Sequence, residues 1–203
     1  MFITFEGGEG SGKTSLIEMI KDTLIKMGID VVTTREPGGS VIAEQIRRII
    51  LDNQNTAITP HTEALLFAAS RAQHLDEVII PAKKEGKLIL CDRYLDSSLA
   101  YQAYGRNLGE DFVLSINRYA TDHMPDLTFY IDVDPEIGIA RVKKNRTHKS
   151  DRLDVETHEF HKRVREGYLE LVCKDTNRVV LVNGNQSIDA IYEIVMNKIK
   201  ERL

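Results

Sequence analysis

The stretch FEGGEGSGKTS, Phe5 to Ser15, decides the fold of this chain. It follows directly after the strand-like run 2–5 and directly precedes a helical pattern, and it contains Gly-x-x-x-x-Gly-Lys-Thr at residues 7–14. Glycines allow consecutive backbone N–H groups to turn inward around a phosphate, and the N-terminus of the next helix adds its dipole. A glycine-rich turn without a ligand is the alternative, but the four fixed residues of the motif in this context favour a nucleoside-triphosphate site.

This loop gives the first set of candidate site residues. Lys13 is expected to reach the β- and γ-phosphates of ATP, and the Thr14 hydroxyl is expected to ligate Mg²⁺. The motif does not name the acceptor, but the chain has no Asn-Lys-x-Asp run typical of guanine-specific GTPases, and motor ATPases are usually larger. A small-molecule kinase is therefore favoured. The predicted ATP-binding residues are Gly7, Gly8, Glu9, Gly10, Ser11, Gly12, Lys13 and Thr14.

Strand-like and helical patterns alternate along the rest of the chain. Such alternation predicts an α/β fold in which helices cover both faces of a parallel sheet. Helical periodicity is clearest in three places: residues 16–27, which Gly28 ends, residues 160–171, and residues 188–199 after a probable Ser187 cap. The densely charged segment 143–156 has no apolar periodicity and is interpreted as a surface loop. The strand-like runs are 2–5, 30–34, 87–91, 127–133 and 178–182.

Length, charge and composition limit the class of protein. The 203 residues suggest one domain, and a formal net charge of −4 makes a general nucleic-acid binder unlikely. No apolar run approaches the roughly 20 residues of a membrane span, and no export signal is evident before the first strand. Cys91 and Cys173 are expected to be reduced core thiols, which fits a cytoplasmic protein.

A second anion site is expected where two strands end. Arg35 follows the second strand and Arg93 the third, while Arg47 lies on the next helix after the Gly-Gly turn. Because ligands of open parallel sheets bind at the carboxyl ends of the strands, these guanidinium groups are placed to grip a phosphate. Asp92 ends the third apolar run, where an NTPase places a carboxylate that helps to hold Mg²⁺. The alternative is a structural ion pair between Asp92 and Arg93.

Longer runs of sequence carry a family resemblance. They are TREPGG (Thr34–Gly39), LLFAASRAQH (Leu65–His74), CDRYLDSSLAYQ (Cys91–Gln102), PDLTFYIDVDPEIG (Pro125–Gly138) and DRLD (Asp151–Asp154). Together they closely resemble bacterial thymidylate kinases. The resemblance implies phosphoryl transfer from ATP to dTMP, with Mg²⁺, in the supply of dTTP for DNA synthesis. It further implies a P-loop NTPase α/β/α fold with strand order 2-3-1-4-5, a short lid at about 143–156, and a homodimer.

The resemblance also assigns contacts with dTMP. Phe67 would stack on the thymine ring, Arg71 would donate to a thymine carbonyl, and Ser98 and Gln102 would complete the base edge. Tyr101 would lie beside the sugar C2′, where its bulk disfavours a ribose hydroxyl. For Phe67 alone, a core aromatic is the alternative. The remaining dTMP contacts implied by the resemblance are Glu9 near the 3′-hydroxyl and Arg35, Glu36, Pro37, Arg47 and Arg93 around the phosphate.

The catalytic cations are expected to be Lys13, Arg93 and an arginine of the lid. The variable positions of the phosphate loop carry no basic residue, so the family pattern passes this role to Arg146 or Arg152. A merely solvated charged loop is the alternative. Two rival functions stay open: a kinase of the same fold that acts on another acceptor, such as a deoxynucleoside, and a non-enzymatic module that senses ATP.

Overall fold

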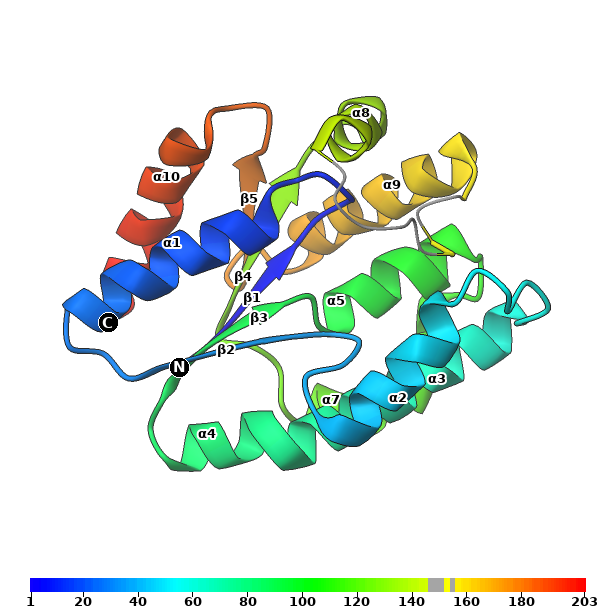
Figure 1. Ribbon diagram of the computed structural model, residues 1–203, viewed down its shortest axis with the longest axis horizontal. Coiled ribbons are helices and arrows are strands. Elements are labelled where there is room, and N and C mark those ends of the chain that lie inside the picture. Colours follow the sequence, from blue (N-terminus) through cyan, green and yellow to red (C-terminus); the bar gives the residue numbers. More distant parts are fainter. Residues whose placement is uncertain (146–151, 154–155) are drawn as a thin grey trace.

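A five-stranded parallel sheet organises the molecule (Figure 1). The computed structural model describes residues 1–145, 152–153 and 156–203. The strand order is β2-β3-β1-β4-β5, and every neighbouring pair is parallel. The predicted fold class and strand order are therefore confirmed. The strands are β1 (Phe2–Glu6), β2 (Val31–Arg35), β3 (Leu88–Asp92), β4 (Leu127–Asp132) and β5 (Val179–Asn183).

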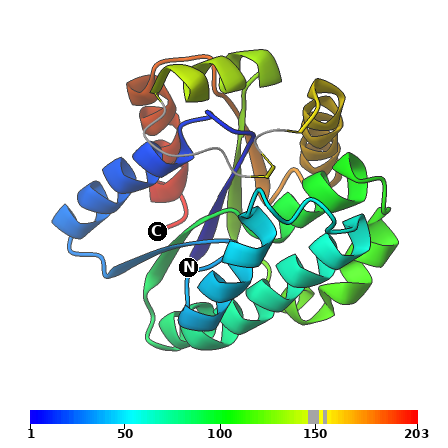
Figure 2. The same ribbon diagram turned by 45° about the vertical axis from the view of Figure 1, so that its right-hand side comes forward.

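Helices cover both faces of this sheet, so the domain has three layers (Figures 1 and 2). The helices α1 and α10 pack on one face, and η1, α4, η2 and α9 pack on the other. The helices are α1 (Lys13–Lys26), α2 (Val41–Leu51), α3 (Pro60–His74), α4 (Ile80–Lys84), α5 (Leu95–Ser98), α6 (Glu110–Ile116), α7 (Arg118–Thr121), α8 (Pro135–Asn145), α9 (His158–Lys174) and α10 (Ile188–Lys200), with the π-helical segments η1 (Leu75–Ile79) and η2 (Leu99–Gly105).

The central strand β1 shows why the strands are continuously apolar. Ile3 and Phe5 pack among the side chains of α1 and α10, whereas Phe2 packs on the opposite face with η1 and α4. Successive side chains of a strand point to opposite faces, so a strand covered by helices on both sides must be apolar at every position. The polar residue Thr4 is tolerated because its hydroxyl pairs with that of Thr128 on β4 at 2.7 Å.

Local sequence signals set several helix ends. The side chain of Ser187 caps α10 by accepting from the backbone N–H of Ala190, as predicted. Gly28 follows α1 in the left-handed conformation, with φ of 82°, and ends that helix as predicted. None of the helices in the described part of the chain is long and apolar enough to cross a membrane.

Three predictions from the sequence need correction. Cys91 is buried and free, but Cys173 is free and exposed, so it is not a core residue. The reason is helical geometry, because Cys173 lies two residues after the buried Leu171 and therefore about 200° around α9. The helical pattern predicted to reach residue 27 ends one residue earlier, since α1 ends at Lys26 and Met27 is its C-cap. The helix α8 continues to Asn145, so residues 143–145 of the predicted loop are helical.

Candidate active site

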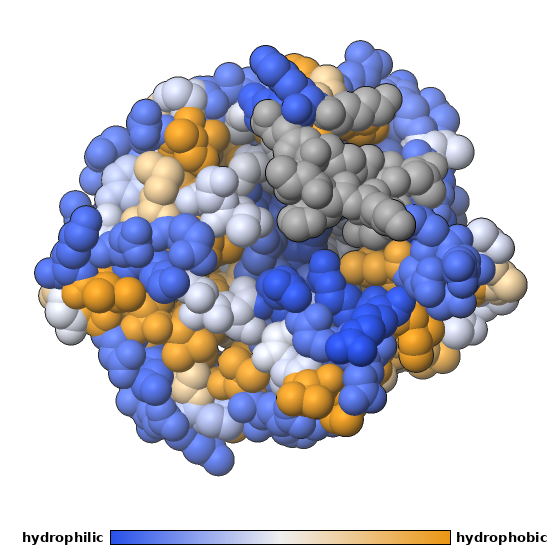
Figure 3. Space-filling model, in the orientation of Figure 1, coloured by the Kyte–Doolittle hydropathy of each residue, from blue (hydrophilic) through white to orange (hydrophobic). Residues whose placement is uncertain are grey.

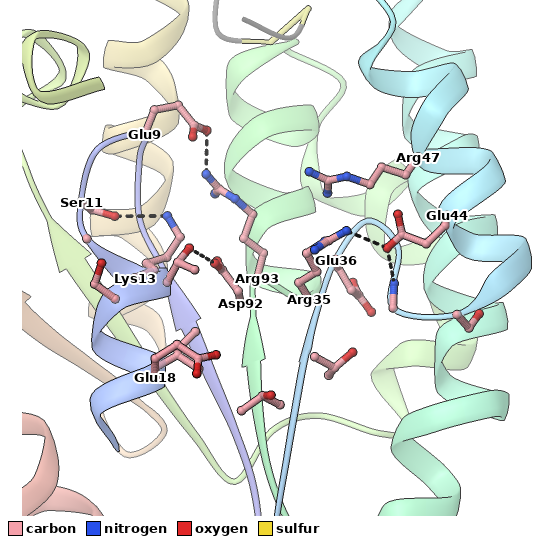
Figure 4. A pocket seen from close by; sticks show the side chains of 18 of the residues that line it. Glu9, Ser11, Lys13, Glu18, Arg35, Glu36, Glu44, Arg47, Asp92 and Arg93 are labelled. Atoms are coloured by element: carbon pink, nitrogen blue, oxygen red, sulfur yellow. Dashed lines mark hydrogen bonds and ion pairs between the residues drawn. The ribbon is translucent and has the colours of Figure 1, made fainter. Parts of the chain in front are cut away.

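A cleft of about 1000 Å³ opens at the carboxyl ends of β1, β2 and β3. The loop after β1 forms one side, and residues from the end of β2 and from α2 form the other (Figure 4). In the space-filling view, strongly hydrophilic residues lie beside a hollow near the middle of this face (Figure 3). The parallel arrangement thus brings the strand ends that the sequence singled out to one place.

The loop after β1 has the backbone of a phosphate cradle. Gly7 and Gly10 have φ of 146° and 70°, which L side chains rarely adopt. A Cβ atom would lie 2.6 Å from the carbonyl oxygen of Ile131 at Gly7, and 2.2 Å from that of Gly138 at Gly10. The loop can therefore approach β4 and α8 only because these two positions are glycine.

Lys13 is the cation of this cradle. Its Nζ donates to the carbonyl oxygens of Gly7 at 3.0 Å and Gly8 at 3.2 Å, and to the hydroxyl of Ser11 at 3.1 Å. Burial lowers the pKa of the Lys13 ammonium, and the nearby Arg93 lowers it further. The ammonium thus lies within the loop on neutral oxygen acceptors, which phosphate oxygens could replace.

Thr14 and Asp92 meet at the floor of the cleft. The Thr14 hydroxyl donates to Oδ2 of Asp92 at 3.1 Å, which leaves the hydroxyl lone pairs available. Asp92 Oδ1 is buried and accepts no hydrogen bond from any described residue. An acceptor-only oxygen beside a hydroxyl oxygen is a donor set that suits Mg²⁺. The alternative ion pair between Asp92 and Arg93 does not occur, because Arg93 pairs with Glu9 instead.

Arg93 lies between the cradle and the rest of the cleft (Figure 4). Its Nη2 donates to Oε1 of Glu9 at 2.7 Å, and its guanidinium lies 5.0 Å from the centre of the Tyr101 ring. Arg93 has φ of 70°, a left-handed conformation that is uncommon for a residue other than glycine. This backbone turn directs the side chain from the end of β3 back toward the phosphate loop.

Glu9 is an ionised carboxylate within this group. Burial raises the pKa of Glu9, but Arg93 and then Lys13 outweigh that effect and hold the pKa below its ordinary value. The hydroxyl of Tyr101 donates to the same Oε1 at 3.1 Å. Glu9, the acid of the phosphate loop, therefore contacts Arg93 of the second anion site as well as Tyr101.

A smaller pocket of about 100 Å³ adjoins the cleft and shares Glu9, Glu36, Arg47 and Arg93 with it. It brings together most of the residues that the resemblance assigned to dTMP. Arg35 lies outside it, with a half-exposed side chain that donates to Glu44 at 3.0 Å. The lining residues are Glu9, Glu36, Pro37, Arg47, Leu51, Phe67, Arg93, Ser97, Ser98, Tyr101, Gln102 and Leu153.

Arg71 lies behind the wall of this pocket. It is 2% exposed and does not line the pocket. Its Nε donates to Glu36 at 2.7 Å, and its Nη1 donates to Ser98 at 2.9 Å and to Asn117 at 2.6 Å. Arg71 therefore fixes two residues of the pocket wall, and its predicted contact with the base stays a prediction.

The two candidate arginines of the lid have different outcomes. Arg146 lies outside the described residues. Arg152 donates to the carboxylate of Glu63 at 2.6 Å and to the carbonyl oxygen of Ile50 at 2.9 Å. The next residue, Leu153, is buried against Phe67 and lines the smaller pocket. The structure thus places Arg152 beside the smaller pocket and not among the residues that line the cradle.

Sequence reasoning missed several residues that hold the site together. Glu6 precedes the phosphate loop and accepts hydrogen bonds from the backbone of Tyr94 at 2.7 Å and the hydroxyl of Tyr168 at 2.8 Å. Burial, together with the nearby Asp96, raises the pKa of Glu6 to about 7. An acid at the end of an otherwise mostly apolar strand was a signal for it. Glu63 had no such signal, because its partners are remote in the sequence.

Comparison with known proteins gives one consistent finding. Residues 5–195 match the sequence profile of the family described as thymidylate kinase. A protein of Acholeplasma laidlawii named thymidylate kinase is 67% identical over 203 residues, which cover 100% of both chains. One of Clostridium novyi with the same name is 52% identical over 98% of both chains. One of Aster yellows witches'-broom phytoplasma, also so named, is 50% identical over 99% of this chain and 97% of its own.

Proposed function

This chain belongs to the thymidylate kinase family, and from that premise we propose how its cleft carries out the family's reaction, in which the γ-phosphoryl group of ATP is transferred to dTMP to give ADP and dTDP. The observation that carries the proposal is the position of Arg93. It lines both the cleft and the smaller pocket, and it contacts the phosphate loop through Glu9. One guanidinium can therefore contact an acceptor phosphate close to a phosphate bound in the cradle.

The cradle binds the triphosphate of ATP. The backbone N–H groups of residues 7–14 and the N-terminus of α1 face the phosphates, and Lys13 exchanges its contacts with Gly7 and Gly8 for phosphate oxygens. Phosphoryl transfer asks for little covalent chemistry from the protein, so alignment and neutralisation of charge supply most of the catalysis.

Thr14 and Asp92 are the residues that would hold Mg²⁺. Their side chains already adjoin, and the buried Oδ1 of Asp92 has no donor among the described residues. The ion, when bound, supplies positive charge to the β- and γ-phosphate oxygens. The protein's own share is to fix both oxygen ligands at the floor of the cleft before the substrates arrive.

The smaller pocket binds dTMP. Arg93 and Arg47 grip its phosphate, Phe67 stacks on the base, and Tyr101 lies beside the sugar with Glu9 near the 3′-hydroxyl. The buried residues Glu36 and Arg71 hold this wall in place through their ion pair of 2.7 Å. A lid that follows α8, within the predicted segment 143–156, closes over the substrates, with Arg146 or Arg152 as the cation that reaches the transferring phosphoryl group.

We place the enzyme in the cytoplasm as a single-domain homodimer that contributes to dTTP synthesis. The two unpaired cysteines, one of them exposed, support a reducing compartment. Support for a dimer comes from exposed apolar side chains on α2 and α3, a feature typical of interaction surfaces. They are Val41, Ile42, Ile49 and Leu65.

The test is an acceptor panel. Release of ADP is measured with ATP and Mg²⁺ in the presence of dTMP, dUMP, dCMP or thymidine. We expect the highest kcat/KM for dTMP and almost no turnover of thymidine, which lacks the phosphate that Arg93 and Arg47 would hold. Faster turnover of thymidine would favour a deoxynucleoside kinase. Tight binding of ATP without ADP release for any acceptor would favour a nucleotide-sensing module.

A further inference from the structure

Glu63 is a buried carboxylate in the first turn of α3, and the mechanism above gives it no role. It is 1% exposed and receives donors from three directions. Gln102 Nε2 lies 3.0 Å from its Oε1, Arg106 Nη2 lies 2.9 Å from its Oε2, and Arg152 Nη2 lies 2.6 Å from the same Oε2. One of these donors, Gln102, also lines the smaller pocket.

This carboxylate is ionised. Burial raises the pKa of Glu63, but hydrogen bonds from Arg106, and then from Gln102 and Arg152, outweigh burial and hold the pKa below its ordinary value. An ionised carboxylate accepts hydrogen bonds and cannot donate one. A neighbouring amide must therefore turn its NH₂ group toward Glu63, because its carbonyl oxygen would meet only another acceptor.

The orientation of the Gln102 amide follows from this restriction. Its Nε2 is committed to Glu63, so its Oε1 points away from Glu63. No described residue donates a hydrogen bond to that oxygen, although Gln102 is only 1% exposed. Because Gln102 lines the smaller pocket with Phe67 and Ser98, the free oxygen is available to a ligand there. The assignment of amide oxygen and nitrogen thus rests on the chemistry of the partner.

An amide oxygen in this position distinguishes pyrimidine bases. Thymine and uracil carry a hydrogen on N3, which can donate to Gln102 Oε1. Cytosine has a lone pair on N3, which would face the oxygen as a second acceptor. The unmade hydrogen bond leaves a buried polar group unpaired, and that is costly in a site built for a donor.

We propose that Glu63 is a positioning residue that selects acceptors with a base N3–H, thymine or uracil, over cytosine by holding the Gln102 amide with its oxygen toward the base. The inference rests on the proposed function, which places the base beside Phe67. The base preference of the acceptor site would then depend on Glu63, which does not line the pocket itself but contacts Gln102, which does.

The variant Glu63→Gln tests this directly, because a second amide can both donate and accept and so leaves Gln102 free to turn. We expect the ratio of kcat/KM for dTMP to that for dCMP to fall about tenfold or more. The change should appear mainly as a higher KM for dTMP, with kcat less affected. The reason is that the base makes the same contact in the enzyme–substrate complex and in the transition state.

Glu156→Gln is the matched control. Glu156 pairs with the same Arg106, at 2.6 Å, whereas the side chain of Gln102 donates to Glu63 and not to Glu156. Its neutralisation therefore removes a charge from the same group of residues without releasing the Gln102 amide. We expect that variant to keep the wild-type ratio. An unchanged ratio in Glu63→Gln, or an equal fall in Glu156→Gln, would overturn the proposal. Equal turnover of dCMP and dTMP by the wild-type enzyme would also overturn it, whereas a wild-type enzyme that does not turn over dTMP would refute the proposed function itself.

A second measurement is made on the wild-type enzyme, and a variant serves only to assign one signal. The side-chain NH₂ signal of Gln102 can be assigned in ¹⁵N-labelled protein by its loss in Gln102→Leu. We expect its protons to show nuclear Overhauser effects to the Glu63 side chain, both in the free enzyme and with dTMP bound. Overhauser effects from these protons to the bound base, with none to Glu63, would contradict the proposed orientation.

Discussion

The two sides of the cleft are built in different ways. On the side of the cradle, the acceptors of Lys13 are two, five and six residues away in the sequence, and two of them are backbone carbonyls. On the side of the smaller pocket, the contacts join side chains that are far apart, such as Arg71 with Asn117 and Glu63 with Arg152, which are 46 and 89 residues apart.

This difference teaches what each side depends on. The cradle needs a local backbone conformation, and its glycines at 7 and 10 supply it. The pocket needs buried charged groups that satisfy one another, such as Glu36 and Arg71. Removing one partner from such a group leaves a charge uncompensated, so its loss is costly. Substitutions on the cradle should thus affect chemistry, whereas those behind the pocket should also affect selectivity or stability.

Loss of the cradle's cation should give the largest effect. Lys13→Ala removes the ammonium that would stabilise the transferring phosphoryl group, so we expect kcat to fall about 100- to 1000-fold. Turnover is measured as ADP release at saturating dTMP, with thermal unfolding as the check on folding. Lys21→Ala, on the same helix and paired with Glu18 at 3.2 Å, is the control and should be near wild type. Near-normal turnover of Lys13→Ala would contradict the assignment.

Loss of Arg93 tests the connection between the two sides. Arg93→Ala removes the predicted grip on the acceptor phosphate and also leaves Glu9 without its ion-pair partner. We expect kcat/KM for dTMP to fall about 100-fold. The exposed Arg118, on α7, provides the control Arg118→Ala. If Arg93→Ala kept its kcat/KM for dTMP, the acceptor phosphate would have to bind elsewhere.

The pKa of Glu6 predicts a pH dependence of stability. Because the folded protein raises this pKa from 4.5 to about 7, its stability should decrease as the pH rises from 4.5 through 7, by up to about 3 kcal/mol. The charged groups near it include Asp96, Arg93 and Lys13, and the hydroxyls of Ser97 and Tyr168 donate to it.

Urea unfolding at pH 5 and pH 8 measures this effect. Glu6→Gln cannot ionise, so the free energy of unfolding of the wild type, relative to that variant, should be lower at pH 8 than at pH 5. An equal difference at both pH values would mean that Glu6 titrates normally in the folded protein.

The metal ligands should give the smallest of these effects. Thr14→Val keeps the shape of the side chain but removes the hydroxyl oxygen beside Asp92, so we expect about tenfold weaker activation by Mg²⁺. Thr14→Ser keeps the oxygen and should stay near wild type. Activity is measured against Mg²⁺ concentration at fixed ATP. The same activation curve for Thr14→Val and the wild type would exclude Thr14 as a ligand.

The same difference explains how much the sequence could predict. The cradle is a contiguous motif, so Lys13 and Thr14 could be assigned from spacing alone, and the end of β3 located Asp92. Most residues of the smaller pocket came only from the family resemblance. Periodicity predicts which face of a helix is buried, but it does not name a partner many residues away.

The residues that sequence reasoning missed follow from that limit. Glu63 stands in an ordinary first helical turn, and only the fold shows that Gln102, Arg106 and Arg152 converge on it. The resemblance assigned Arg71 to the base, but only the fold shows that its guanidinium also donates to the remote residues Glu36, Ser98 and Asn117. Side-chain pairing across the sheet edge could not be derived from the local sequence.

The central claim is that a cluster of side chains, built around Arg93, holds the phosphate of the acceptor. Calorimetric titration of dTMP and of thymidine into the wild-type enzyme without ATP tests it most directly. The two ligands share the base and the sugar, so the difference in Kd reports the grip on the phosphate. We expect dTMP to bind at least about 100-fold more tightly, a difference of about 2.7 kcal/mol. Equal affinities for the two ligands would contradict the claim.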